Sequence, residues 1–506
     1  MGNDYIEAAR IFHEVTKHSY TSVRSSPHFL DWDIKPLPYK IYPGAASVAL
    51  PRDLNLSSTP TLAALSSYVP ADFSAPIDTP ALTRILFCAD GLTRHKRVGA
   101  DDYHFRAAPS AGALYPIEIY VAASDVDVLE NGLYHFSPAD LRMTGLRRGD
   151  WRSYIAEAAA QRPSIRHASV VIALSAIYWR SEWKYRARAY RYCYWDAGTL
   201  LANLLAAAAA EEISAEVITA FEDPALEKLL GIDGEREGMI ALVALGRSDQ
   251  PATPSPQIEP LTLESIPLSA KDEVYQDRVK MHRESRLVTA DEVAMVSAAK
   301  LESAPSESPP SANALHLETI TSEESAGLGE TILRRGSSRA FAQQAITAEE
   351  LATILAASSV HPQADFPALT EIYLIVNAAE GLEPGAYYYN RDGRAFELLK
   401  AGNFRGEAGY LCLEQPLGMD CSALVVYMAD LERALHALGN RGYGYAHLEA
   451  GILGGRAYLA AYSLGRGATG LTFYDDDTTK FFEPHAAGKS PLWMVALGIP
   501  RSRMKS

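Results

Sequence analysis

Glu118-Ile119-Tyr120 recurs as Glu371-Ile372-Tyr373, 253 residues later, and this repeat decides the fold. Three further pairs share that spacing: Gly132-Leu133-Tyr134 with Gly385-Ala386-Tyr387, Gly149-Asp150-Trp151-Arg152 with Gly402-Asn403-Phe404-Arg405, and Asp196-Ala197-Gly198 with Glu449-Ala450-Gly451. Two more pairs lie 252 residues apart: Thr219-Ala220-Phe221 with Leu471-Thr472-Phe473, and Ala244-Leu245-Gly246 with Ala496-Leu497-Gly498. Matches that keep one order with a slip of one residue indicate two copies of one domain.

The repeat divides the 506-residue chain into four parts. We expect an N-terminal extension at 1–75, copy one at 76–250, a linker at 251–325 and copy two at 326–506. The linker holds a charged stretch at 271–300, which we expect to be helical. A Pro/Ser tract at 303–311 follows, and its composition does not support a packed core.

Both copies predict the same succession of elements. Thr79-Pro80 places a hydroxyl cap before a first-turn proline, and Thr347 with Glu350 has the spacing of a capping box. A long helix is expected after each Asp/Glu-Ala-Gly triplet. The predicted strands are 117–123, 169–176 and 240–245 in copy one, and 372–377, 423–429 and 492–497 in copy two. Helices and strands mix without strict alternation, which predicts an α+β fold.

Composition excludes several classes of protein. The net charge of −15 and the lack of a basic patch argue against nucleic-acid binding. The longest apolar run, 200–210, is too short to cross a membrane, and the first residues lack the apolar region of a signal peptide. We therefore expect a cytoplasmic globular protein. Its four cysteines show no CxxC spacing, so neither a metal site nor a disulfide scaffold is expected.

The two copies differ where a ligand site would lie. Copy one carries Pro109-Ser110-Ala111-Gly112 before its first strand, and copy two has the stretch 361–370 at that place, which lacks the Pro-Ser-Ala-Gly core. Conversely, copy two opens with Arg334-Arg335-Gly336-Ser337-Ser338-Arg339-Ala340-Phe341, and copy one has no such cluster. Complementary losses are expected when a two-fold dimer with two sites becomes one chain with one site.

The residue types indicate what that site holds. Arginines beside hydroxyl groups offer bidentate donors to a phosphate, and a loop of small residues lets its backbone approach a flat ring. Each motif alone also has an ordinary explanation. The arginine cluster would be a solvated basic turn, and the loop would be a plain β-turn.

On these motifs the chain resembles flavin-dependent nitroreductase-fold proteins, and within them the SagB/ThcOx-type azoline dehydrogenases. The resemblance implies two tandem nitroreductase-like domains that form an intramolecular pseudo-dimer with one FMN between them. It implies that Arg335, Ser337 and Arg339 hold the FMN phosphate and ribityl chain. It also implies that the isoalloxazine is contacted from the opposite copy by Pro109, Ser110, Ala111, Gly112 and Leu114.

Two further flavin contacts follow from the resemblance. Gly470-Leu471-Thr472 is similar to a stretch whose backbone N–H groups lie near flavin N5, and Arg501 and Arg503 resemble a C-terminal basic pair on the phosphate. The run 465–470 matches GxGxxG, but it follows a helix and leads into a strand, so a dinucleotide fingerprint is rejected. The alternatives are a glycine-rich helix end and a basic tail.

Lys184-Tyr185 is the most discriminating pair, because azoline dehydrogenases are similar here, and copy two has only Asn440-Arg441-Gly442-Tyr443 in the corresponding region. A lysine beside a flavin and apolar walls has a lowered pKa and suits proton abstraction, with Tyr185 as relay or donor. Without the resemblance, the stretch would be a solvated helix rich in Arg and Tyr. Thr199 departs from the family, which has histidine at this position.

The resemblance implies oxidation of a thiazoline or oxazoline in a modified peptide to the azole. The base takes the Cα proton, a hydride leaves Cβ for flavin N5, and oxygen reoxidises FMN. The expected partners are a peptide or small-molecule substrate and a cyclodehydratase, with further pairing into a homo-oligomer left open. Two alternatives remain: an NAD(P)H-dependent nitro- or quinone reductase, and a non-catalytic peptide-binding subunit of a heterocycle-forming complex.

Overall fold

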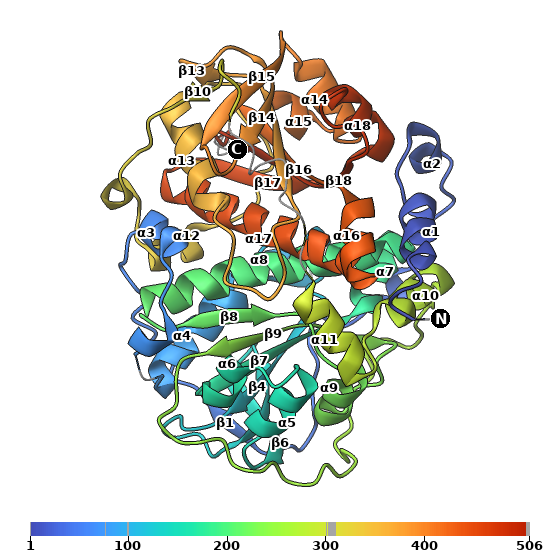
Figure 1. Ribbon diagram of the computed structural model, residues 1–506, viewed down its shortest axis with the longest axis vertical. Coiled ribbons are helices and arrows are strands. Elements are labelled where there is room, and N and C mark those ends of the chain that lie inside the picture. Colours follow the sequence, from blue (N-terminus) through green and yellow to red (C-terminus); the bar gives the residue numbers. More distant parts are fainter. Residues whose placement is uncertain (1, 76, 99–100, 300, 302–309, 502–506) are drawn as a thin grey trace.

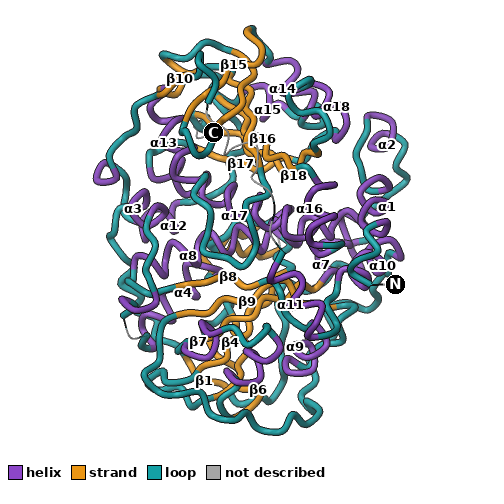
Figure 2. The backbone as a smooth tube through the Cα atoms, in the orientation of Figure 1, coloured by secondary structure: helices purple, strands orange, loops and turns teal. Residues whose placement is uncertain are grey.

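The computed structural model describes residues 2–75, 77–98, 101–299, 301 and 310–501. Two sheets lie at opposite ends of the molecule, with a layer of helices between them (Figures 1 and 2). Copy one forms the lower half of Figure 1 and copy two the upper half. The arrangement is an α+β pseudo-dimer within one chain, as predicted.

Each sheet has seven strands, and neighbouring strands run antiparallel. The first has the order β1 (Ser47–Ala49), β6 (Arg142–Arg148), β5 (Gly132–Ser137), β4 (Ile117–Ala123), β7 (Val170–Ile177), β9 (Glu237–Leu245), β8 (Ala215–Ile218). The second has the order β10 (Leu315–His316), β15 (Ala395–Ala401), β14 (Gly385–Asn390), β12 (Glu371–Val376), β16 (Ala423–Ala429), β18 (Ser490–Gly498), β17 (Gly467–Leu471). Strand for strand the two orders are the same, which confirms the duplication.

Two long helices, α8 (Ala189–Ala210) and α17 (Arg441–Ser463), cross at the centre of the molecule. Both are almost wholly buried on every face, with a few polar side chains such as Asp196 and Arg456 among the apolar ones, as expected of helices enclosed by protein. Two pairs of shorter helices flank them: α3 (Thr61–Ser66) with α12 (Leu328–Arg334), and α4 (Thr79–Asp90) with α13 (Ala348–Ser358).

The remaining helices and short strands complete the two halves. They are α1 (Glu7–Val15), α2 (Tyr20–Arg24), β2 (Leu92–Val98), β3 (Asp101–Arg106), α5 (Arg152–Ala158), α6 (Pro163–His167), α7 (Tyr178–Tyr185), α9 (Asp223–Leu230), α10 (Gln276–Ser285), α11 (Ala290–Ala298), β11 (Ile346–Thr347), β13 (Ala379–Glu380), α14 (Arg405–Leu411), α15 (Pro416–Asp420), α16 (Leu431–Leu438) and α18 (Asp475–Phe482).

Helix starts differ from the prediction in two places. Asp78, not Thr79, caps α4, because its carboxylate accepts from Ala81 N at 2.7 Å. The prediction of a helix that follows the triplet is wrong, since α8 begins at Ala189 and Asp196 lies inside it. The reason is that Asp196 binds a neighbouring loop rather than the helix backbone. The capping box at Thr347 and Glu350 is confirmed.

The segments outside the two copies take part in the fold. The N-terminal extension supplies β1 at the edge of the first sheet, and the linker supplies β10 at the edge of the second. Strands of two or three residues are too short for sequence self-comparison to detect. Helix α1 lies beside copy two (Figure 1), where Ala9 N donates to Asn440 Oδ1 at 3.0 Å. The stretch expected to be helical contains α10 and α11, whereas residues 302–309 of the Pro/Ser tract lie outside the described residues.

Ion pairs between the copies follow the internal symmetry. Arg188 at the start of α8 pairs with Asp475 of copy two at 2.9 Å, and Arg441 at the start of α17 pairs with Asp223 of copy one at 2.7 Å. All four side chains are buried, and Arg191 also pairs with Asp475 at 2.8 Å, so the loss of either aspartate would leave a buried arginine without a charged partner. In the described residues, no helix has the length and apolar character needed to cross a membrane.

Candidate functional site

The two half-sites predicted from sequence line one cavity between the copies, which we call the interface cavity. Copy one contributes Pro109–Gly112, Lys184 and Tyr185, and copy two contributes Arg335, Ser337, Arg339 and residues 470–472. The cavity measures about 460 Å³, within the range of small-molecule sites. Tertiary structure therefore brings together motifs of the two copies that lie at least 150 residues apart in the chain.

Helix α8 holds the small-residue loop in place. Asp196 accepts from Ser110 Oγ at 2.5 Å and from Ala111 N at 3.0 Å, and Thr199 Oγ1 donates to Pro109 O at 2.7 Å. Thr199, where the resemblance to azoline dehydrogenases implies a histidine, thus binds the loop backbone. Burial raises the pKa of Asp196 to about 7, although the hydrogen bonds from Ser110 and Ala111 oppose this.

Gly112 joins this loop to the Lys184-Tyr185 pair. Its φ of +67° is a left-handed conformation that favours glycine. A Cβ at this position would lie 2.7 Å from the Tyr185 hydroxyl and 3.2 Å from Lys184 Nζ. Only glycine therefore lets the pair approach the loop, so both copy-one motifs form a single structural unit.

Lys184 and Tyr185 end helix α7 and face the cavity. The ring of Tyr185 packs edge-on against Tyr192 at a centroid distance of 4.6 Å, and Lys184 Nζ lies 5.3 Å from the Tyr185 ring centroid. Burial lowers the pKa of Lys184, and the positive charge of Arg339 lowers it further. Burial raises the pKa of Tyr185, which keeps its hydroxyl protonated. The pair thus combines a lysine that more readily becomes a neutral base with a proton donor.

Three arginines line the cavity without a carboxylate partner among the described residues: Arg94, Arg335 and Arg339. Arg335 is buried and crosses between the copies, where its Nε donates to Ala107 O at 2.8 Å and its Nη2 to Arg106 O at 2.7 Å. Arg94 comes from β2 and lies beside Arg335, with its Nη1 3.6 Å from the Cβ position at Gly336. Unpaired guanidinium groups of this kind favour an anion such as a phosphate.

Aromatic rings form one wall of the cavity. Trp195 of α8 and Tyr458 of α17 each stack on Trp493 of β18, with interplanar angles of 19° and 13°. The Tyr458 hydroxyl accepts from Gly470 N and lies 3.4 Å from Ser337 Oγ, so it links two of the predicted motifs. Flat, apolar walls of this kind suit a planar ring system.

Some predicted residues lie elsewhere. Leu114 does not line the cavity and packs with Trp179 and Trp183 instead. Arg501 is exposed and is not among the lining residues, although its backbone N–H donates to Ala340 O, next to Arg339. Arg503 lies outside the described residues. Gly465 of the GxGxxG run ends helix α17 with a left-handed φ of +73°, as the helix-end alternative has it. Residues 467–470 lie in strand β17, so the run is not a dinucleotide loop.

Several lining residues were not predicted. Arg94 has no motif around it, and Tyr192, Trp195, Tyr458 and Trp493 occupy buried positions that read as core in the sequence. Of the unpredicted lining residues, only Asp196 could have been singled out from the sequence, because its Asp-Ala-Gly triplet recurs as Glu449-Ala450-Gly451. No cluster of His, Cys, Asp and Glu suited to a metal ion occurs within residues 2–75, 77–98, 101–299, 301 and 310–501.

The fold and the cavity define a class of protein: two fused copies of one α+β domain that share a ligand site at their interface. The nitroreductase family model matches residues 74–247 and 332–499, and the chain therefore belongs to the nitroreductase family, a family of oxidoreductases. Members of this family generally bind FMN.

Two relatives support this assignment. A protein of Methanocaldococcus jannaschii, provisionally named a nitroreductase, is 30% identical over 174 residues, which cover 34% of this chain and 83% of the relative. A crystal structure from Anabaena variabilis, also provisionally named a nitroreductase, is 27% identical with a TM-score of 0.78. That match covers 98% of this chain and 99% of the other, so the Anabaena protein has the same two-copy architecture.

The residues of the interface cavity fit FMN. The unpaired Arg94, Arg335 and Arg339 match the charge of a phosphate, and the stacked rings and the small-residue loop match a flat tricyclic ring. Both requirements are met in one cavity.

Proposed function

We propose that the chain is an FMN-dependent oxidoreductase with one flavin in the interface cavity. The observation that carries this proposal is the meeting of the two complementary half-sites, each present in only one copy, in a single cavity. Arg335, Arg339, Arg94 and Ser337 would hold the phosphate and ribityl chain. The Pro109–Gly112 loop and residues 470–472 would border the ring.

The cofactor supplies the redox chemistry: when bound, FMN takes up a hydride and returns the electrons to an acceptor such as oxygen. The protein supplies the orientation of the substrate and the movement of its proton. Lys184 is the proposed base and would accept a proton at Nζ. Tyr185 would donate to the substrate or relay the proton.

We propose a thiazoline or oxazoline in a modified peptide as the substrate. It would lose a proton from Cα to Lys184 and a hydride from Cβ, which leaves the aromatic azole. This assignment is supported by the Lys184-Tyr185 pair beside the Pro109–Gly112 loop. A cyclodehydratase, which forms azolines, would supply the substrate.

A second candidate function is NAD(P)H-dependent reduction of nitro compounds or quinones. The names of the M. jannaschii and A. variabilis relatives favour it. In this case the substrate would accept electrons rather than lose them.

Two measurements test the proposal. Mass spectrometry of the cofactor released from purified protein identifies FMN or excludes it. Anaerobic mixing with a synthetic azoline peptide then separates the two candidates. Bleaching of the flavin absorbance with formation of azole supports the dehydrogenase, whereas bleaching by NADPH alone supports the reductase. A purified protein that holds no flavin and binds none would contradict both.

A further inference from the structure

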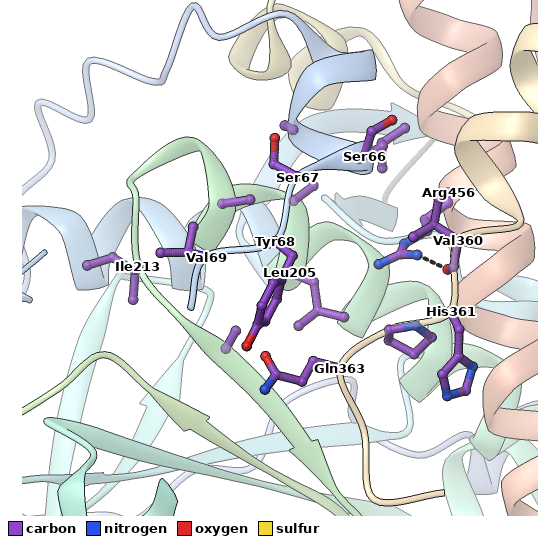
Figure 3. A pocket seen from close by; sticks show the side chains of 16 residues that line it. Ser66, Ser67, Tyr68, Val69, Leu205, Ile213, Val360, His361, Gln363 and Arg456 are labelled. Atoms are coloured by element: carbon purple, nitrogen blue, oxygen red, sulfur yellow. Dashed lines mark hydrogen bonds between the residues drawn. The ribbon is translucent and has the colours of Figure 1, made fainter. Parts of the chain in front are cut away.

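A second cavity lies between the copies, on the other side of the α8–α17 crossing. It measures about 290 Å³ and is lined by Ser66–Val69, the end of α8 from Leu205, the turn before β8 and Val360–Gln363, with Arg456 from α17 (Figure 3). Nothing in the proposed chemistry uses it.

Internal symmetry relates this second cavity to the interface cavity. Pro362 and Gln363 match Pro109 and Ser110 at the repeat spacing of 253 residues, and Leu205 matches Tyr458. Residues 67–69 follow α3 as residues 335–337 follow α12, but they contain no arginine. The cavity is therefore the counterpart of the interface cavity without its phosphate motif.

In the second cavity, a chain segment fills part of the space that corresponds to the proposed flavin-ring position in the interface cavity. Val217 N donates to Gln363 O at 2.9 Å, and Asp365 N donates to Val217 O at 3.1 Å. Asp365 also accepts from the backbone N–H groups of Thr219 and Ala220. The segment from Gln363 to Asp365 thus pairs with the edge of β8, where the corresponding edge of β17 borders the interface cavity.

Arg456 is an unpaired charge in this cavity. It is 7% exposed, and its guanidinium bonds only to the backbone oxygen of Val360 (Figure 3), with no carboxylate partner in the described chain. Burial lowers the pKa of Arg456 to about 10, with a further contribution from Arg391. Glu449 on the same helix is already held by Arg391 at 3.2 Å and by His361 at 3.1 Å.

Copy one has no arginine that corresponds to Arg456. Copy one has Asn203 at the matching position, and that amide donates to Cys88 O inside the core. A buried cation without an acidic partner is costly, and an anionic ligand would offset that cost.

The rest of the lining defines the ligand. Leu205, Ile213 and Val69 present apolar surface, and Tyr68 and Gln363 lie across the cavity from Arg456 (Figure 3). One guanidinium, where the interface cavity has three, suits a single negative charge. The planar fork of arginine matches a carboxylate. The small volume limits the apolar body to a compact one.

We infer that the second cavity binds a small organic acid, whose carboxylate pairs with Arg456 and whose apolar body lies against Leu205 and Ile213. This site stands independently of the proposed function, because it shares no residue with the interface cavity.

Calorimetric titration of the full-length protein, as purified, tests the inference with benzoate as the probe. Benzamide of the same shape but no charge and inorganic phosphate are titrated in parallel. We expect benzoate to bind once per chain, and benzamide and phosphate to bind at least about tenfold more weakly, the loss typical of one charge-assisted contact. The substitution Arg456→Gln should weaken the binding of benzoate by the same factor.

Two further variants keep the result decisive. Val69→Trp fills the cavity from a partly exposed position, so it should block benzoate even if Arg456→Gln fails to fold. Lys184→Met alters only the interface cavity and should leave the affinity for benzoate unchanged. The inference is overturned by any of three results: no binding to the wild type, binding lost in Lys184→Met but kept in Val69→Trp, or phosphate that binds as tightly as benzoate.

Discussion

Gly198 of α8 and Gly451 of α17 touch at the centre of the molecule, and they are the same residue of the two copies. A Cβ at Gly198 would lie 2.6 Å from Gly451 Cα, and a Cβ at Gly451 would lie 3.0 Å from Gly198 Cα. The local two-fold axis therefore passes between them. One cavity lies on each side of this crossing, and the two have diverged into unlike sites.

We predict one FMN per chain. The second cavity lacks the arginine motif, and the segment from Gln363 to Asp365 pairs with Val217 where a ring would lie. Flavin released by denaturation, measured against protein concentration, should approach a ratio of one. A ratio near two would contradict the split site.

Arg339→Ala should release flavin. A charge-assisted contact contributes about 1.5–3 kcal/mol, so affinity should fall roughly ten- to hundredfold. Arg335→Ala should act likewise but also removes the bonds to Arg106 and Ala107, so Arg339 is the cleaner test. Retention of flavin through gel filtration is the measurement.

The control for this experiment is Arg334→Ala. Arg334 is exposed and bonds to Glu330 and the Tyr462 backbone rather than to the cavity. Arg152, another arginine outside the cavity, is unsuitable because it is buried against Asp150 at 2.8 Å, and its removal would destabilise the fold. Equal flavin loss in the Arg334 and Arg339 variants would mean that the phosphate assignment is wrong.

Lys184→Met should keep flavin and lose about 10²–10⁴-fold in turnover of an azoline peptide, the usual contribution of a general base. Lys184→Arg should be as inactive, because a guanidinium does not deprotonate. Tyr185→Phe should lose less turnover than Lys184→Met, since it keeps the aromatic ring and removes only the hydroxyl group.

The pH profile gives a second readout of Lys184. Because burial lowers the pKa of Lys184, the wild-type rate should rise with pH and level off below the ordinary lysine pKa of 10.5. Both Lys184 variants should lack this rise of the rate with pH. Unchanged turnover in Lys184→Met would show that the pair is structural.

Gly112→Ala should displace Lys184 and Tyr185 while flavin stays bound. Misplacement of catalytic groups by about 1 Å costs about 10²-fold in rate. Gly44→Ala is the matched control, since Gly44 has a φ of +71° but no atom within 4 Å of its Cβ position. If both variants keep wild-type turnover, the contact between Gly112 and the pair has no catalytic consequence.

Asp196→Asn should change how stability depends on pH. The folded pKa of about 7 exceeds the ordinary value of 3.8, so Asp196 binds a proton more tightly in the folded state, and its contribution is lost as pH rises from about 4 to 7. Each pKa unit corresponds to about 1.4 kcal/mol. Asparagine has no such titration, so the melting temperature of the variant relative to wild type should be higher at pH 7.5 than at pH 5. A constant difference would contradict the assignment.

Local chemistry explains which elements could be predicted. The strands 117–123 and 423–429 match β4 and β16, because both are short, mainly apolar stretches rich in β-branched and aromatic side chains, which favour strands. The capping box at Thr347 is equally local. Asp78 was missed as a cap because Thr79 beside it is also a capping residue.

Long-range contacts explain what could not be predicted. Arg94 reaches the interface cavity only because the β2–β3 hairpin lies beside Gly336 of the other copy. Trp195 and Trp493 form a wall because two helices and a strand from different parts of the chain converge. No local pattern distinguishes these residues from core.

The sequence by itself determined the duplication, the α+β class and the two complementary motifs. Repeats, hydrophobic periodicity and charged loops are patterns of residue types along the chain, so they can be identified without the fold. Only the tertiary structure decided that the motifs share one cavity, that Gly112 makes room for Lys184 and Tyr185, and that Arg456 stands without an acidic partner. The reason is physical: these properties depend on the close crossing of α8 and α17 at Gly198 and Gly451, where packing distances of a few ångströms select which residues meet.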